Sequence, residues 1–354
     1  ANNNGIPDMI EDAKGKIIND NINHSTVLTS AYGGTGEITD TKYWDESEKE
    51  LAKYNEGTTL SKDDTGKYIV TMTDANNIIA TNESIGTLGR VNSLIHSFEI
   101  DSGAGNDLFI TAADTGLPVD RELTINTGSG NDVYINGISN REHKIVYGTD
   151  GIFRIESSGY ALQNGEHQIY RDGDHYQRYN TEGGVINNAI INMGDGDDTL
   201  LNVGYLRTNV SIKGSKIDMG AGSDIITLYG DITDAWNSIK GGAGIDSFTH
   251  NWGAVDSKYI SGFETLNLGN KSALKLYADY LTKDGGIEEG ILKINGESGT
   301  SVDLGNNGNN LSDNNGTWTK GEAKSEDGVN YHVYTHSGNP DVQVWIDDDI
   351  KQVI

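Results

Sequence analysis

The residues with the clearest chemical potential are five aspartates, each at the end of the same short motif. The motif reads Ile-x-x-Gly-x-Gly-x-Asp and occupies positions 100–107, 125–132, 191–198, 217–224 and 239–246. A carboxylate beside turns that expose backbone carbonyls is a donor set suited to Ca²⁺, which binds six to eight oxygens. In four copies Asp or Asn also follows the Ile. The candidate metal ligands are Asp101, Gly103, Gly105, Asp107, Asn126, Gly128, Gly130, Asp132, Asn192, Gly194, Gly196, Asp198, Asp218, Gly220, Gly222, Asp224, Gly242, Gly244 and Asp246.

The spacing of the motifs predicts how these residues are positioned. Their first glycines lie at 103, 128, 194, 220 and 242, so the steps are 25, 66, 26 and 22 residues. Short steps of this length fit one coil of a right-handed parallel β-solenoid, because a fixed period signals a repeat architecture. The long step fits two coils plus an insertion at residues 138–185. Apolar residues at alternate positions after each Asp, such as Ile226 and Leu228, predict strands with one face in a core.

Stacked coils would bring the aspartates together. Neighbouring strands lie about 5 Å apart, so each Asp is expected beside the Asp of the next coil. Such a column is repulsive unless a cation bridges the carboxylates. The alternative is a metal-free β-helix that uses Gly and Asp only in its turns. The last copy has Lys240 and Ile245 where the others are polar, which predicts a weaker or empty site there and two or three strong ions in all.

Composition narrows the class of protein. The 354 residues include 53 acidic and 26 basic side chains, a formal net charge of −27. This charge argues against binding nucleic acid or an anionic membrane surface. The absence of cysteine excludes disulfides, thiolate zinc sites and cysteine nucleophiles. No apolar run is long enough to span a bilayer, so no membrane insertion is expected.

The segments around the repeats have other compositions. Residues 1–95 are expected to form an α+β cap over the open N-terminal end of the solenoid, with short helices near 6–15 and 43–54. The insertion at 138–185 is rich in Tyr, His and Arg, a mixture suited to recognising a peptide or glycan. A hairpin whose tyrosines pack locally is the alternative. The candidate ligand-binding residues are Arg171, Asp172, Asp174, His175, Tyr176 and Tyr179.

The C-terminal part, residues 271–354, is predicted to be a β-rich antiparallel cap that follows the repeats of residues 96–270. Phe263-Glu-Thr-Leu-Asn-Leu-Gly is expected to form one more coil without its metal turn, and residues 273–281 a short helix. Alternating residues and Asn-Gly turns predict strands beyond them. Gly328-Val-Asn-Tyr-His-Val-Tyr334 is expected to form a hairpin.

Residues 96–354 resemble the C-terminal region of giant RTX (repeats-in-toxin) adhesins of bacteria, on the glycine–aspartate motifs, the Phe-Glu-x-Leu-x-Leu coil and this hairpin. The RTX nonapeptide Gly-Gly-x-Gly-x-Asp-x-apolar-x binds Ca²⁺ in a β-helix, although here single motifs are separated by a whole coil. The resemblance implies a monomeric, non-catalytic module of a type I-secreted protein at the bacterial cell surface. It would bind a peptide or glycan on cells or in biofilm, with Ca²⁺ as its cofactor.

Two alternatives remain at this stage. One is a purely structural spacer or cap of the adhesin. The other is a polysaccharide lyase or epimerase, since parallel β-helices house such enzymes and Arg154, His175 and Tyr176 could supply a base. The chain has no His-Glu-x-x-His helix and no Gly-x-Ser-x-Gly elbow, which argues against a metalloprotease or lipase.

Overall fold

The architecture is taken from a computed structural model of the chain. It describes residues 59–65, 67–74, 78–81, 98–111, 115–116, 123–136, 143–147, 153–157, 160–161, 186–202, 212–269, 271–281, 287, 290–305 and 316–353. Within these ranges the chain forms β-strands and short 3₁₀ helices and no α-helix. None of the helices in the described part is long and apolar enough to cross a membrane. The prediction of a mostly β protein is confirmed.

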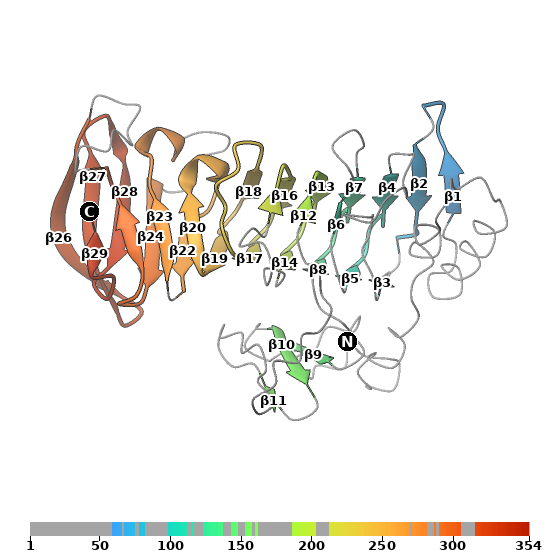
Figure 1. Cartoon of the computed structure of the whole chain (residues 1–354), viewed down its shortest axis with the longest axis horizontal. Helices are drawn as coiled ribbons and strands as arrows, with labels where there is room; N and C mark the ends of the chain where they lie inside the picture. The colour runs from blue at the N-terminus through green and yellow to red at the C-terminus, as the bar shows by residue number, and fades with distance from the viewer. Residues whose placement is uncertain are drawn as a thin grey trace.

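One long sheet holds the strand that enters each Gly-x-Gly-x-Asp motif (Figure 1). Its strands pair in parallel and in register, except that the first two are antiparallel. Its order is β1 (Thr59–Lys62), β2 (Tyr68–Thr71), β4 (Phe98–Asp101), β7 (Leu123–Asn126), β13 (Ala189–Asn192), β16 (Lys216–Ala221), β18 (Ser238–Ala243) and β21 (Ile260–Ser261).

A second long sheet holds the strand that leaves each motif. It is parallel from β3 to β28, and its last three strands form an antiparallel meander. Its order is β3 (Ile78–Thr81), β5 (Leu108–Thr111), β8 (Val133–Asn136), β14 (Thr199–Asn202), β17 (Ile225–Tyr229), β19 (Ser247–Asn251), β22 (Thr265–Leu268), β24 (Ile291–Gly296), β28 (Asn339–Asp347), β27 (Val329–His336) and β26 (Trp318–Glu326).

Two shorter parallel sheets are formed by strands that follow, along the chain, a strand of the second long sheet. One has the order β6 (Thr115–Gly116), β12 (Ile186–Asn187) and β15 (Ile212–Lys213). The other contains β20 (Gly253–Asp256), β23 (Ser272–Lys275), β25 (Ser301–Asp303) and β29 (Gln352–Val353), with 3₁₀ helices η3 (Ser257–Tyr259) and η4 (Ala278–Tyr280) after its first two strands. As far as β22 the chain therefore passes from the first long sheet to the second, then through a short sheet or loop back to the first. Beyond β22 it alternates between the second long sheet and the short sheet that contains β23. We call each such passage a circuit.

The insertion between β8 and β12 contains a separate antiparallel sheet. Its strands are β9 (His143–Tyr147), β10 (Phe153–Ser157) and β11 (Tyr160–Ala161), with β10 in the centre. Figure 1 draws these strands away from the row of stacked circuits.

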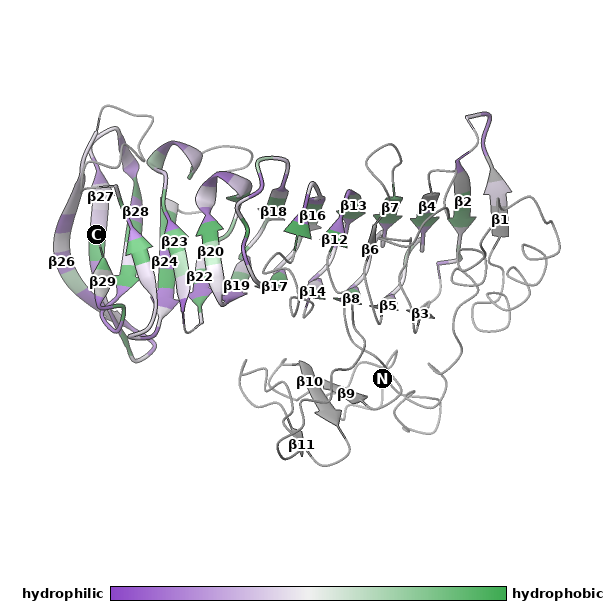
Figure 2. Cartoon of the chain, viewed as in Figure 1, coloured by the Kyte–Doolittle hydropathy of each residue, from purple (hydrophilic) through white to green (hydrophobic). Residues whose placement is uncertain are grey.

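The core is a continuous apolar column enclosed by the sheets. In the first sheet the Ile that opens each motif is buried, and its equivalents pair in register. In the second sheet the facing positions are also buried and apolar: Phe109, Tyr134, Leu200, Ile226 and Phe248. Figure 2 shows the resulting alternation of apolar and polar residues along the C-terminal strands. The two-residue period of a strand puts every second side chain into this core.

The structure differs from the sequence-based predictions in two details. The helix predicted at 273–281 is wrong in its first half, where β23 alternates between buried and exposed side chains and only Ala278–Tyr280 is helical. Leu274 and Leu276 are both buried, a period of two that marks a strand rather than a helix. Parallel pairing also begins at Tyr68, N-terminal to residue 96. The helices predicted near 6–15 and 43–54 lie outside the described residues.

Candidate functional site

The five motifs stack on one another at a single edge of the molecule, where the two long sheets meet. Each motif links a strand of the first sheet to a strand of the second, as β16 leads into β17 and β18 into β19. Backbone hydrogen bonds join consecutive turns: Gly196 N–H donates to the Ala221 carbonyl at 2.7 Å, and Gly222 N–H to the Ala243 carbonyl at 2.9 Å. We call the stacked segments 103–107, 128–132, 194–198, 220–224 and 242–246 the Gly–Asp corner.

The glycines are required by both conformation and space. Gly220 has φ +103°, and a Cβ placed on it would lie 1.8 Å from the carbonyl oxygen of Gly194 in the preceding circuit. Only glycine tolerates this φ without strain, and only glycine lets two backbones approach so closely. The same contact recurs down the stack, with Gly242 lying over the Gly220 oxygen. The turns therefore repeat because each is shaped by the one before it.

The aspartates that end the motifs form a buried column. In each circuit the Asp N–H donates to the Oδ1 of the next Asp, at 2.7 Å from Asp132 to Asp198 and 2.8 Å from Asp198 to Asp224. The column ends at Glu264, whose Oε2 accepts from the Asp246 N–H at 2.8 Å. The members of this inner carboxylate column are Asp107, Asp132, Asp198, Asp224, Asp246 and Glu264.

The second oxygens of this column carry the chemical interest. The Oδ2 atoms of Asp198 and Asp224 are buried and have no hydrogen-bond partner. The pKa of Asp198 is raised to about 9 and that of Asp224 to about 7, chiefly by burial and in part by the adjacent carboxylates. Burial likewise raises the pKa of Asp132 to about 7, partly offset by the Thr127 hydroxyl. A buried carboxylate that is ionised needs a compensating charge, so these oxygens suit either a proton or a cation.

A cation here would depend on backbone oxygens as well as side chains. Among the described residues, no three His, Asp or Glu side chains converge on one point as a metal-binding group. Ca²⁺ accepts carbonyl oxygens beside carboxylates, and the Gly–Asp corner supplies both. The orphan oxygens of Asp198 and Asp224 are the carboxylate atoms that such an ion would neutralise.

The second position of the motif lies apart from the inner carboxylate column. Asp101, Asn126, Asn192 and Asp218 follow the inward-facing Ile, so they lie on the outer face of the first sheet. They are half-buried or exposed, and the Asn192 amide donates to the Asn126 Oδ1 at 2.8 Å. The structure thus separates the second-position residues from the terminal aspartates.

An outer column of side chains also runs along the corner. The Asn106 Oδ1 accepts from Asn131 N–H at 2.8 Å, the Asn131 Oδ1 from Asp197 N–H at 3.1 Å, and the Asp197 Oδ1 from Ser223 N–H at 2.8 Å. Here each side chain binds the following circuit, whereas each inner aspartate binds the preceding one. The two columns connect consecutive circuits in opposite directions.

The sequence predicted a coil at residues 263–269 but not the place of Glu264 in the inner carboxylate column, and it missed an earlier copy of the repeat. Glu264 aligns with Asp246 once Leu266 is matched to its register partner Phe248, and the acidic residue two positions before an apolar one was the available signal. An earlier degenerate copy spans 70–78, because Thr71 pairs with Asp101 and Ile78 with Leu108. There the Asp74 Oδ1 accepts from Ala104 N–H at 3.2 Å, where later circuits use a glycine carbonyl.

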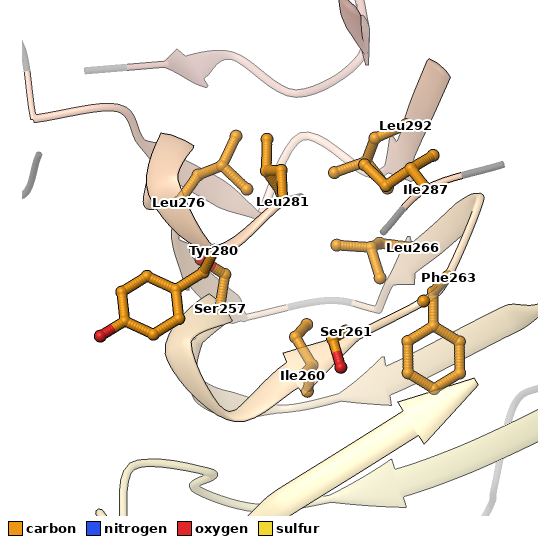
Figure 3. Close-up of a pocket in the computed structure, with 11 residues that line it drawn as sticks. Ser257, Ile260, Ser261, Phe263, Leu266, Leu276, Tyr280, Leu281, Ile287 and Leu292 are labelled. Carbon is orange, nitrogen blue, oxygen red and sulfur yellow. The ribbon is translucent and has the colours of Figure 1, made fainter. Parts of the chain in front are cut away.

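The predicted ligand-binding residues Arg171, Asp172, Asp174, His175, Tyr176 and Tyr179 lie outside the described residues. A small apolar pocket is present between β21 and β24, lined by Ile260, Leu266, Leu276, Leu281 and Leu292 among others (Figure 3). Its free volume of about 20 Å³ holds one water molecule and no larger ligand.

Comparisons of the chain with family models, with curated proteins and with solved structures find no match.

Proposed function

We propose that the chain is a calcium-dependent, extracellular module of an RTX-type adhesin, built as a right-handed β-solenoid whose Gly–Asp corner binds Ca²⁺. The observation that carries the proposal is the pair of buried, unpartnered Oδ2 atoms at Asp198 and Asp224. These oxygens lie in a column of carboxylates one circuit apart, where ionised side chains repel one another. A divalent cation shared between neighbouring circuits neutralises two carboxylates at once.

The net charge of the chain supports a cation rather than a proton as the physiological partner. Twenty-seven excess negative charges oppose the compact state through self-repulsion. Protonating an aspartate removes one negative charge, whereas each bound Ca²⁺ removes two, so two or three ions lower the net negative charge by four to six. Because the cation binds the folded corner and not the unfolded chain, its binding free energy adds to the free energy of folding. The module would then fold where calcium is abundant, outside the cell.

Thermal unfolding in calcium and in a chelator tests this proposal. We expect the melting temperature to fall sharply when EGTA replaces Ca²⁺, and magnesium to restore less of it, because Mg²⁺ demands a stricter octahedral geometry. Isothermal titration is expected to give two or three strong sites. A melting temperature that is the same in calcium and in EGTA would contradict calcium binding.

The adhesive role rests on the insertion at 138–185 and is a separate part of the proposal. We propose that Arg171, Asp172, Asp174, His175, Tyr176 and Tyr179 bind a peptide or glycan at a cell surface or in biofilm. A peptide and glycan array probed in calcium, with Asp174→Ala and Tyr176→Ala as variants, tests this role. Hits that both variants lose support it, and an array without hits favours a structural spacer.

A further inference from the structure

The loop after β17 lies at the opposite end of the circuit from the Gly–Asp corner and is held on both sides. Ile232 is fully buried, donates its N–H to the Ala254 carbonyl at 2.7 Å and accepts from Asp256 N–H at 3.1 Å. Asn237 is also buried, and its side chain accepts from Ser215 N–H at 3.2 Å and donates to the Ile212 carbonyl at 3.0 Å. The loop is therefore fixed to the preceding and the following circuits.

This fixed loop presents an indole to solvent. The Asp234 Oδ1 accepts from Trp236 N–H at 3.0 Å, and the Asp234 carbonyl accepts from Asn237 N–H at 3.1 Å, so the turn that carries Trp236 is closed on itself. The Trp236 side chain is 80% exposed. The Trp236 ring contributes nothing to the core, and a tryptophan of this kind, apolar with one polar N–H, is enriched at binding interfaces.

The circuits that follow continue an aromatic row from Trp236. Ile232 bridges Val255, and Ile239 pairs with Ile260, so the loop 233–238 that carries Trp236 stacks on the segment 256–259. In the next circuit Asp256 pairs with Lys275, and the Ser257 hydroxyl accepts from Tyr277 N–H at 2.9 Å, which brings Tyr277 and Tyr280 beside Tyr259. Tyr277 is buried, with 7% of its surface exposed, so it supports this surface from below. We call Trp236, Tyr259 and Tyr280 the aromatic row.

Polar groups accompany these rings. Burial raises the pKa of Tyr259, and the carboxylates of Asp256 and Asp234 raise it further, as expected for acids close to its hydroxyl. The Lys258 ammonium lies 4.0 Å from the centre of the Tyr277 ring and 6.0 Å from that of Tyr280. The cation is thus placed against aromatic faces, while the carboxylates are left as acceptors along the row.

Tyr280 separates this surface from the small apolar pocket. Figure 3 shows its hydroxyl directed away from the cluster of Leu276, Leu281 and Leu292. The Tyr280 residue lines the pocket, and its hydroxyl points away from the pocket. Neighbouring strands are about 4.8 Å apart, close to the length of one sugar unit, so successive circuits can contact successive units of a chain.

We propose that the aromatic row binds a neutral glycan, with Trp236 stacked on one sugar ring and the Asp234 and Asp256 carboxylates accepting its hydroxyl hydrogens. A sugar ring has a flat apolar face with hydroxyl groups at its edge. Such a face can stack on the Trp236 indole while its hydroxyl groups donate to the neighbouring carboxylates. The net charge of −27 repels uronates and sulfated polymers, so the glycan is neutral. This site is separate from the insertion at 138–185, and its existence does not depend on ions at the Gly–Asp corner.

Affinity electrophoresis of the full chain in calcium through gels containing dextran, galactomannan, xyloglucan or alginate tests the site. We expect at least one neutral polysaccharide to retard the wild-type protein, and Trp236→Ala to weaken that interaction at least tenfold. Ile245→Ala is the matched control, because Ile245 is also an exposed apolar side chain, at 55%, and lies at the Gly–Asp corner. Equal melting temperatures in calcium would show that both variants are folded.

Three outcomes would overturn this inference. They are no retardation by any neutral polysaccharide, retardation that Trp236→Ala leaves unchanged, and a preference for alginate that Trp236→Ala abolishes. Retardation that Trp236→Ala removes and Asp174→Ala retains would assign the glycan to the aromatic row and not to the insertion. A melting temperature that is the same with and without calcium would contradict the proposed calcium binding and leave the glycan site untouched.

Discussion

The two ends of each circuit differ in how much sequence they tolerate. At the Gly–Asp corner each of the five motifs uses five residues from the first Gly to the Asp, and their backbones stack within a distance that excludes a Cβ. At the other end the connection is residues 230–237 after β17, 252–259 after β19 and 269–290 after β22. The first end is uniform and the second varies from circuit to circuit.

The difference follows from where the polar backbone groups are satisfied. At the Gly–Asp corner the turn of one circuit provides the hydrogen-bond partners of the next, so an insertion would leave buried groups unpaired in two circuits. At the other end only part of the pairing runs between circuits: the Asp234 side chain accepts from Trp236 N–H within its own loop, while Asp231 accepts from Ala254 N–H of the next circuit. The uniform end suits a periodic cofactor, and the variable end is where a binding surface can differ in each circuit.

The largest effect is expected from adding one methyl group at the uniform end. Gly220→Ala places a Cβ 1.8 Å from the Gly194 oxygen at φ +103°, so two backbones must separate. We expect a loss on the order of 4 kcal/mol or more in the free energy of unfolding, or failure to fold. Urea denaturation in calcium measures it.

Gly328→Ala is the matched control for this prediction. Gly328 has φ +85° and no atom within 4 Å of its would-be Cβ, so only the strain of the left-handed conformation is added. That strain costs about 1–2 kcal/mol. Equal losses in the two variants would mean that close stacking does not restrict the corner.

Sequence reasoning predicted the uniform end better than the variable one. Five copies of Ile-x-x-Gly-x-Gly-x-Asp identify the turns, because one geometry imposes the same residues each time. Glu264 was missed because a longer side chain replaces Asp once the glycines are gone. Trp236 was missed because its loop does not repeat, and its exposure depends on anchors at Ile232 and Asn237 whose partners lie in other circuits.

Removing one charge from the inner carboxylate column comes next in size. Asp198→Asn keeps an oxygen that can accept from Asp132 N–H but loses the ionised oxygen. In EGTA we expect a change of about 1 kcal/mol or less in unfolding free energy, since Asp198, with its pKa near 9, is already mostly protonated at pH 7. In calcium we expect much of the stabilisation by the ion to disappear. Melting curves of the variant in both solutions measure this.

Asp218→Asn is the control in the same circuit. Asp218 is exposed on the outer face of β16, so its charge is far better solvated than that of Asp198. We expect the melting-temperature difference between calcium and EGTA to be nearly that of the wild type. If Asp218→Asn reduced the melting-temperature difference between calcium and EGTA more than Asp198→Asn does, the ion would have to bind at the outer face of the first sheet.

The pH dependence separates a proton from a cation at the same oxygens. The folded pKa values of Asp132, Asp198 and Asp224, about 7, 9 and 7, lie above the ordinary value of 3.8. The folded state therefore holds protons that the unfolded state has released, and this contribution is full below about pH 4 and lost as pH rises through the folded values. In EGTA we expect the melting temperature to fall between pH 7 and pH 9.

Calcium is expected to flatten this fall, because an ion stabilises the ionised carboxylates. The buried His250, whose pKa burial lowers to about 4, affects stability only as pH falls below its ordinary value of 6.5, so it does not contribute in this window. A melting temperature in EGTA that is constant or rises from pH 7 to pH 9 would show that the column is already compensated.

The smallest effect is expected in the outer column, where the Asp197 side chain accepts from Ser223 N–H. Ser223→Asn supplies the longer side-chain acceptor that Asn106 and Asn131 provide in earlier circuits, now directed at the Ile245 N–H. One added hydrogen bond in an exposed position should raise the free energy of unfolding by about 0.5–1 kcal/mol. Because the change adds no charge, the gain should be equal in calcium and in EGTA. A gain confined to calcium would instead mean that the outer column contributes a ligand, and the separation of a structural outer column from a cation-binding inner one would fail.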